Sequence, residues 1–306
     1  MDIYFAPLQG YTQAEYRRLH AEIYGGVDYY YSPFLRVENG EVRRRDILDI
    51  KKDNNIGIKL IPQVIASNVE ELNLTVNAIK TQGYSHIDLN MGCPFPLQTK
   101  KGRGAGLLAN INRVKDIFKA IVDYADITFS LKMRTGMTDV QECFDILPLI
   151  NELPLKHIVM HPRLGIQQYK GNVDMSVFAT FYKECSHPIV YNGDVTTLKD
   201  IEQIKNEFPN LMGIMIGRGL LSRPSLATEY KTNQILSRDE RVELLLKFHD
   251  RLFCYYCNKL QGDAHILAKM KTFWDYVTIE TIDKKALKAI KKSISISKYS
   301  AIIKMI

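Results

Sequence analysis

The feature of this chain that most restricts its fold is a regular alternation of short apolar runs with longer amphipathic segments over residues 1–235. Many of the runs are apolar on both faces, as are strands of a parallel sheet that is covered on both sides. Strands are expected at residues 3–6, 27–31, 58–65, 87–90, 127–134, 157–161, 189–191 and 213–216. Helices are expected between them, for instance at residues 68–82, 111–124, 140–153, 175–185 and 198–207. Eight such units predict an α/β fold of the (β/α)8 TIM-barrel type.

A doubly wound parallel sheet is the alternative arrangement of these elements. It is disfavoured because the sequence lacks a dinucleotide-binding fingerprint: Gly102-Arg103-Gly104 follows a loop and misses the third glycine. Near residue 235 the pattern changes to helical spacing without strand signals, at residues 241–261, 264–277 and 283–301. We therefore expect a barrel domain at residues 1–235 and a small all-helical domain at residues 236–306.

The excess positive charge lies at the end of the chain. The net charge is +7, and residues 231–306 hold 15 lysines and arginines against 8 aspartates and glutamates, whereas residues 1–230 hold 26 of each. A neutral body with a basic appendage is typical of an enzyme that binds a polyanion. Four lysines share one side of the third expected C-terminal helix: Lys284, Lys288, Lys291 and Lys292. The alternative is that these lysines form an ordinary solvated face.

Composition limits where such a chain acts. Its start lacks the basic segment and apolar core of a signal peptide, and no apolar run approaches the roughly 20 residues of a membrane helix. Five scattered cysteines favour a reducing compartment over a disulfide framework. Cys254 and Cys257 form a CxxC pair inside a helical pattern, without a second pair, so no metal site is expected. We expect a cytoplasmic monomer that binds no membrane.

Polar residues cluster where the expected strands end. The carboxyl ends of the strands carry the active site in a TIM barrel, so these residues are candidates for catalysis and binding. In chain order they are Pro7, Gln63, Asn90, Cys93, Lys132, Arg134, His161, Arg163, Asn192, Gly193, Asp194, Gly217 and Arg218.

The last two clusters predict a phosphate site. Glycines after strands seven and eight allow backbone N–H groups to approach an anion, and Arg218 adds a cation. The loops after these two strands carry the phosphate site in many TIM barrels. Ordinary turns at Asn192-Gly193 and Gly217-Arg218-Gly219 are the alternative.

Two cations are expected to share one face of strand five. Side chains alternate along a strand, so Lys132 and Arg134 point the same way, toward the barrel interior or its mouth. Burying them is costly unless an anion or an electron-rich group meets them. The alternative is an exterior pair packed against helices. His161 ends strand six; a lone histidine is more often structural, but its position at a strand end makes it a candidate.

The stretch Asn90-Met91-Gly92-Cys93-Pro94 ends strand four and brings one thiol to the barrel mouth, before a glycine-rich cationic loop that contains Lys100, Lys101 and Arg103. With the strand-end motifs above, it resembles the tRNA-dihydrouridine synthase family, and the resemblance covers nearly the whole chain. The family consists of flavin enzymes that reduce uridines in tRNA. The resemblance implies FMN as cofactor, NADPH as reductant and tRNA as partner.

The resemblance also implies roles for individual residues. Contacts to the flavin ring are implied for Pro7, Gln63, Lys132 and His161, and contacts to its phosphate for Asn192, Gly193, Asp194, Gly217 and Arg218. Cys93 is the implied proton donor. Uridine contacts are implied for Asn90, Arg134 and Arg163, and tRNA phosphate contacts for Lys100, Lys101, Arg103 and the basic helices.

Uracil chemistry is consistent with these roles. The C5=C6 bond is conjugated to the C4 carbonyl, so it accepts a hydride at C6, from flavin N5, and then a proton at C5. A thiol near its ordinary pKa of about 8.5 is still protonated at neutral pH and can supply that proton. The base must first be flipped out of the folded RNA.

The sequence departs from the family pattern at three places. Phe95-Pro96-Leu97 stands where a lysine or arginine is common, Gly165 replaces a second arginine after His161 and Arg163, and Gln13 follows Thr12 in place of aspartate. Two other functions stay open. One is a flavin barrel enzyme acting on a free pyrimidine, like dihydroorotate dehydrogenase, and the other is a tRNA-binding protein without catalysis.

Overall fold

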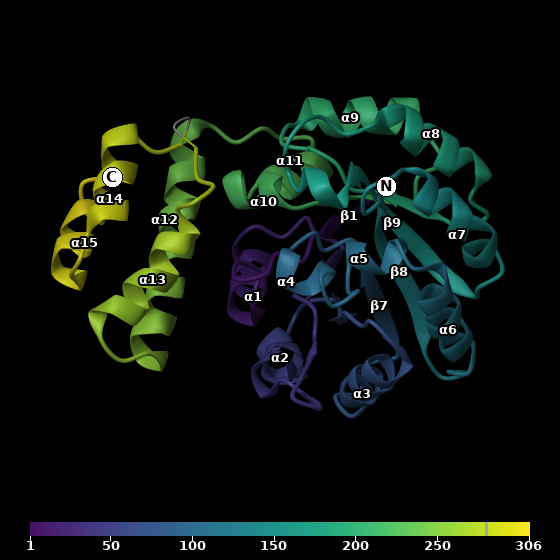
Figure 1. Ribbon diagram of the computed structural model, residues 1–306. Helices are drawn as coiled ribbons and strands as arrows, with labels where there is room; N and C mark the ends of the chain where they lie inside the picture. The colour runs from purple at the N-terminus through teal and green to yellow at the C-terminus, as the bar shows by residue number, and fades with distance from the viewer. Residues whose placement is uncertain (279–280) are drawn as a thin grey trace.

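A ring of parallel strands surrounded by helices forms the larger part of the molecule, and a group of helices packs at one side of it (Figure 1). The computed structural model describes residues 1–278 and 281–306. The strands are β1 (Asp2–Phe5), β2 (Tyr29–Tyr31), β5 (Leu60–Ile61), β6 (Gln63–Val64), β7 (His86–Met91), β8 (Thr128–Gly136), β9 (Leu155–Leu164), β10 (Ile189–Tyr191) and β11 (Gly213–Ile216). Their order in the sheet is β5-β2-β1-β11-β10-β9-β8-β7-β6, and every pairing is parallel.

The two edges of this sheet belong to one interrupted strand. Only Pro62 separates β5 from β6, and a proline has no N–H to give to a neighbouring strand. Its carbonyl still accepts the Asp88 N–H at 2.9 Å, so β7 continues the sheet across the interruption. The sheet therefore comes round on itself with eight strand segments, which confirms the predicted TIM barrel.

Helices cover the outside of the ring. They are α1 (Ala14–Ile23), α2 (Arg44–Ile50), α3 (Val69–Lys80), α6 (Ile111–Val122), α7 (Gln141–Asn151), α8 (Met175–Glu184), α9 (Leu198–Glu207), α10 (Arg218–Ser222) and α11 (Leu226–Thr232). The spacing of the buried residues of α6, namely Val114, Ile117, Phe118 and Ile121, places them on one face toward the strands. The Asn68 side chain begins α3 by accepting the Glu71 N–H at 2.9 Å.

Shorter elements decorate the loops. They are the hairpin β3 (Val37–Glu38) and β4 (Glu41–Val42), the helices α4 (Pro96–Thr99) and α5 (Ala105–Leu108), and the 3-10 turns η1 (Lys52–Asn55) and η2 (Gly165–Gln167). The segment after β7, expected to be a glycine-rich cationic loop, thus contains two short helices.

Alternation along the strands separates an outer core from the barrel interior. Ile87, Leu89 and Met91 of β7 belong to the large apolar core between strands and helices. The residues between them, Asp88 and Asn90, are buried on the opposite face. The barrel interior of this protein therefore holds polar groups as well as apolar ones, and these groups lie beneath the site described below.

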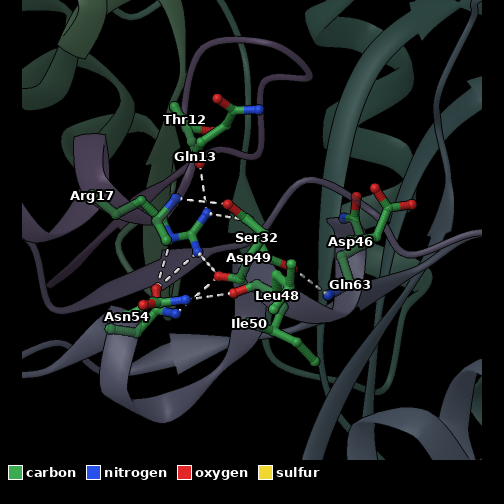
Figure 2. A network of polar contacts seen from close by, with 12 residues as sticks. Thr12, Gln13, Arg17, Ser32, Asp46, Leu48, Asp49, Ile50, Asn54 and Gln63 are labelled. Atoms are coloured by element: carbon green, nitrogen blue, oxygen red, sulfur yellow. Dashed lines mark hydrogen bonds and ion pairs between the residues drawn. The ribbon is translucent and has the colours of Figure 1, made fainter. Parts of the chain in front are cut away.

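A fully buried arginine ties the first barrel units together (Figure 2). The Arg17 guanidinium, on α1, donates to the Thr12 carbonyl at 2.6 Å, to the Asp49 carboxylate at 2.9 Å and to Asn55 Oδ1 at 2.8 Å. These partners lie in the loop after β1, in α2 and in η1. Arg17 thereby fixes the loop that follows the first strand of the ring.

Replacing Arg17 should test this anchor. Arg17→Leu leaves Asp49 without its buried partner, so we expect the free energy of unfolding to fall by about 3–5 kcal/mol in urea titrations. The neighbouring Arg18 pairs with Glu15 and Glu22 at a partly exposed position, and Arg18→Leu should cost less than about 1 kcal/mol. Equal losses in the two variants would contradict the anchoring role.

The C-terminal helices are α12 (Arg238–Lys259), α13 (Asp263–Phe273), α14 (Lys284–Lys292) and α15 (Ile296–Ile303). They pack on α1 through aromatic rings: Phe248 lies 4.8 Å and Phe273 lies 6.4 Å from the ring centre of Tyr16. The change from barrel to helices falls between α11 and α12, close to residue 235. No helix in the described part of the chain is both long and apolar enough to span a bilayer.

The single helix expected at residues 283–301 is wrong, because the structure has two. Ser293 leaves helical geometry with ψ of 138°, and its hydroxyl donates back to the Ile290 carbonyl at 2.7 Å, which ends α14. Ser295 then caps α15 by accepting the Lys298 N–H. The four predicted lysines all lie on α14 and are exposed, and Lys291 is 3.5 Å from the Asp275 carboxylate. We call these four residues the lysine face of α14.

Candidate active site

A cavity opens at the carboxyl ends of the barrel strands, as parallel strands in a closed ring require. Residues predicted from widely separated motifs meet in its wall: Pro7, Gln63, Asn90, Cys93, Lys132, Arg134, His161, Asn192, Gly193, Asp194, Gly217 and Arg218. The predicted residues Lys100, Lys101, Arg103 and Arg163 do not line it. The wall also contains residues that the sequence motifs do not predict, among them Phe34 and Tyr169.

Asn90 and Gln63 hold the cysteine loop from below. Asn90 Oδ1 accepts the backbone N–H groups of Gly92 at 3.0 Å and of Cys93 at 2.8 Å. Asn90 Nδ2 donates to Gln63 Oε1 at 2.7 Å. Asn90, expected to contact the uridine, and Gln63, expected to contact the flavin, are therefore also bonded to each other. Together they fix the backbone conformation at Cys93.

The Cys93 loop is closed by a glycine that no other residue can replace without strain. The Ala105 N–H donates to the Cys93 carbonyl at 3.0 Å. Gly104 has a φ of 60°, and a Cβ there would lie 2.6 Å from the Cys93 carbonyl oxygen. The glycine-rich composition after Gly92-Cys93-Pro94 thus allows the chain to pass directly behind the thiol.

Burial raises the pKa of the Cys93 thiol, while the N–H of Phe95 and the charges of Arg134 and Lys132 act in the opposite direction. The thiol therefore stays protonated at neutral pH and can act as an acid. We expect its alkylation by iodoacetamide to be slower at pH 7–8 than that of free glutathione, and to increase as the pH is raised further. Peptide mass spectrometry separates Cys93 from the exposed Cys254 and Cys257. Alkylation of Cys93 as fast as that of glutathione at pH 7 would contradict a raised pKa.

Lys132 brings a cation into the barrel interior beside this thiol. Among the described residues no hydrogen bond or ion pair engages it, and burial, reinforced by Arg134, lowers its pKa to about 8. A cation shielded from bulk water in this way favours an anion or an electron-rich group in the cavity. The interior orientation is the one expected from the sequence, and the alternative of an exterior pair is wrong.

His161 presents an unpartnered acceptor to the same space. Its Nδ1 lies 2.5 Å from the Asn192 carbonyl, which only accepts, so Nδ1 carries the proton. Burial and the nearby Arg134 keep the pKa of His161 well below its usual value, so the ring is neutral. Nε2 is buried without a hydrogen-bond partner in the described residues. A bound molecule with a donor group fits this orphaned atom.

Arg134 binds the rim together. Its guanidinium donates to the carbonyls of Gly92 at 2.9 Å, Leu164 at 2.8 Å and Gln168 at 2.7 Å. Burial lowers its pKa to about 10, so it remains charged at neutral pH. The side chain predicted to hold a uridine thus also joins the loop after β7 to the end of β9 and to the segment that follows it.

Tyr169 covers two of these cations. Its ring centre lies 5.6 Å from the Arg134 guanidinium and 4.8 Å from that of Arg218, within the range of a cation–π contact. The residue is 51% exposed although it lines the cavity. An aromatic residue six positions after Arg163 was a visible signal in the sequence, but only the fold shows that it turns back over the site.

Arg163 and Asp194 form a pair behind the cavity wall. The Arg163 guanidinium bonds both carboxylate oxygens of Asp194 and donates to the Gly171 carbonyl at 2.7 Å. Arg218 donates to the same carboxylate at 2.7 Å from the cavity side. The bond and charge of Arg163 lower the pKa of Asp194, followed by the charge of Arg218. Arg163 is therefore placed to orient Arg218 through Asp194 and has no direct path into the cavity.

Arg103 differs from the expectation for a phosphate ligand. It is only 4% exposed, donates to Glu71 Oε2 at 2.9 Å and donates to the Val37 carbonyl at 3.0 Å. The loop after β7 is thereby attached to α3 and to the β3–β4 hairpin. Lys100 and Lys101 of the same loop are exposed and border a surface groove outside the cavity.

The fold and the site together define a barrel whose strand-end cavity offers a thiol acid and a free cation. The sequence matches the dihydrouridine synthase family over residues 4–296, and the chain belongs to this family. The expected family and enzyme class, a flavin oxidoreductase, are thus confirmed.

Relatives agree with the assignment. The chain is 26% identical over 227 residues to a tRNA-dihydrouridine synthase B of Pasteurella multocida, covering 73% of this chain and 67% of the relative. It is 25% identical over 279 residues to a probable tRNA-dihydrouridine synthase of Helicobacter pylori, covering 90% and 82%. Among solved structures, morphinone reductase shares the barrel with a TM-score of 0.55 at 12% identity, covering 77% of this chain and 87% of that one.

Proposed function

We propose that this dihydrouridine synthase uses FMN and NADPH to reduce uridines of tRNA at the strand-end cavity, with Cys93 as the proton donor. The observation that carries the proposal is the meeting of a protonated thiol, Cys93, and an unpartnered cation, Lys132, in one cavity. Family membership supports tRNA uridine over a free pyrimidine as the substrate. It also speaks against a protein that only binds tRNA.

The cavity suits a flavin with a phosphate tail. Lys132 would lie at the electron-rich edge of the ring, and the neutral His161 offers an acceptor to a donor group of the cofactor. Pro7 and Gln63 complete the proposed ring contacts. The phosphate is assigned to the segment of Asn192, Gly193 and Asp194 and to Gly217 and Arg218, where Asp194 fixes the direction of the Arg218 guanidinium.

Reduced FMN supplies the hydride that adds to C6 of the uracil. The residues of this chain do the rest. Addition at C6 leaves an enolate over C5 and the C4 carbonyl, and Cys93 Sγ–H gives its proton to C5. The thiolate then takes a proton from solvent. Asn90 and Arg134 at the cavity wall are the proposed uridine contacts, joined by the Tyr169 ring; Arg163 is assigned an indirect role through Asp194.

Affinity for the rest of the tRNA is assigned to two basic surfaces. One comprises Lys100 and Lys101, which border a surface groove outside the cavity, and the other is the lysine face of α14 in the helical domain, residues 236–306. Such contacts are made to phosphates and carry no sequence information. Arg103, which is paired with Glu71, is assigned the positioning of its loop and not a phosphate contact.

Removing the thiol tests the chemistry. Cys93→Ala should bind FMN and accept electrons from NADPH like the unaltered protein, while dihydrouridine formation falls by about 10²–10⁴-fold, because only the proton donor is lost. Cys254→Ala, at an exposed position, is the matched control and should be fully active. Full activity of Cys93→Ala, measured as the two-hydrogen mass gain on tRNA, would contradict the assignment.

Reversing the lysine face tests the RNA surface. The changed residues are Lys284, Lys288, Lys291 and Lys292, each replaced by Glu, and the control replaces four exposed barrel lysines, Lys119, Lys156, Lys183 and Lys199, by Glu. Both variants change the net charge equally. We expect the first to weaken tRNA binding and to flatten its dependence on salt concentration in filter binding, and the control to do so far less. Equal losses of tRNA affinity in the two variants would show that the lysine face of α14 is an ordinary solvated surface.

A further inference from the structure

A buried carboxylate lies beneath the site, and nothing in the proposed chemistry uses it. Asp88 is fully buried on the interior face of β7. Its Oδ2 accepts a hydrogen bond from Gln63 Nε2 at 2.7 Å, and its Oδ1 accepts one from Ser130 Oγ at 2.7 Å. Burying a carboxyl group costs free energy, which suggests that Asp88 has a specific role. Its hydrogen-bond partners indicate what that role is.

The Gln63 bond begins a chain that ends at the thiol loop. Gln63 donates to Asp88, so the other end of its amide, Oε1, faces Asn90 and accepts from Asn90 Nδ2 at 2.7 Å. Asn90 then turns its oxygen to the N–H groups of Gly92 and Cys93. The direction of donation is the same at every link, from the loop backbone to the carboxyl group.

Both ends of this chain are limited to one role. The backbone N–H groups at Cys93 can only donate, and an ionised carboxylate can only accept. Between them stand two amides, each of which would otherwise flip at little cost. The orientations of the Gln63 and Asn90 amides are therefore fixed at both ends of the chain, by the backbone N–H groups at one end and by Asp88 at the interior end.

We propose that Asp88 is a positioning residue for the proton donor: through Gln63 and Asn90 it fixes the backbone at Gly92 and Cys93, and so the place of the thiol. The inference rests on the proposed function of Cys93. It predicts that the loss of Asp88 damages delivery of the proton to the base more than it damages reduction of the cofactor.

The other partner of Asp88 gives it freedom to change protonation without breaking the chain. Burial raises the pKa of Asp88 to about 7, against the opposing effect of the bonds from Gln63 and Ser130 and of Lys132. A protonated Asp88 could donate to Ser130, whose hydroxyl can turn and lies 3.3 Å from His86 Nε2. The oxygen toward Gln63 stays an acceptor in both states. Acceptance from Gln63, and not the negative charge, is therefore the property that matters.

Three variants separate this role from general stability. Asp88→Ala removes the acceptor, Asp88→Asn keeps an acceptor for Gln63 and turns its NH2 to Ser130, and Ser130→Ala removes the bond on the side away from Cys93. In the holoenzyme we would measure two rates separately: reduction of FMN by NADPH, and formation of dihydrouridine after mixing the reduced enzyme with unmodified tRNA.

For Asp88→Ala we expect the second rate to fall about 10–100-fold while the first stays within about twofold, because a small displacement of a reacting group has effects of this size. Asp88→Asn and Ser130→Ala should keep both rates near those of the unaltered enzyme. Parallel losses of both rates in Asp88→Ala, or an Asp88→Asn as impaired as Asp88→Ala, would overturn the inference. An unaltered enzyme without dihydrouridine formation would instead defeat the proposed function.

A reciprocal exchange keeps the inference testable if Asp88→Ala does not fold. In Gln63→Glu the new carboxylate has no hydrogen to give to Asp88, so the link is lost at a pH high enough to ionise both carboxyl groups, and there the second rate should fall. In the double variant Gln63→Glu with Asp88→Asn, the new amide nitrogen at position 88 can donate to the new carboxylate at position 63, which still accepts from Asn90. We expect the double variant to regain at least about tenfold in the second rate over Gln63→Glu, within the range that repositioning a reacting group covers. A double variant no faster than the single one would contradict the chain.

Discussion

Closure of a parallel sheet is the constraint on which the rest of this structure depends. Pro62 divides the third strand into two short pieces, yet its carbonyl still binds β7, so the ring is complete. All strands of the ring then run in the same direction, and their carboxyl ends meet at a single rim. Residues far apart in the sequence, such as Gln63, Lys132 and His161, face one cavity for that reason.

The polar chemistry of the rim is held by hydrogen bonds to the backbone more than by pairs of charges. The Arg134 guanidinium donates to three backbone carbonyls, and Asn90 accepts from two backbone N–H groups of the cysteine loop. Asp194 is the exception, because two arginines converge on its carboxylate. In the described residues no hydrogen bond or ion pair engages Lys132, and His161 Nε2 is buried without a hydrogen-bond partner. Both residues line the cavity, where a cofactor could engage them.

The sequence was sufficient for the fold and for much of the rim. Apolar runs predicted the strands, and alternation predicted that Lys132 and Arg134 share one face. The cost of burying two cations against helices favoured the interior for that face. The end of α14 at Ser293 was not predictable. A serine in a helical pattern ends the helix only where its hydroxyl bond to the backbone is favoured over the next helical hydrogen bond. The ion pair between Arg103 and Glu71 could not be predicted from the sequence either. It forms because the fold places α3 beside the loop after β7, and it buries an arginine that was expected to be exposed. Tyr169 likewise joins the site through the turn after β9.

Reduction of uridine in tRNA at this cavity can be measured directly. The most direct measurement is to incubate the flavin-loaded protein with NADPH and unmodified tRNA and to search for a mass gain of two hydrogens on uridine by mass spectrometry. We expect the gain, at a position that fragment mapping would identify, and we expect it to depend on Cys93. FMN bound and reduced by NADPH, but turnover of a free pyrimidine in place of any gain on tRNA, would contradict it.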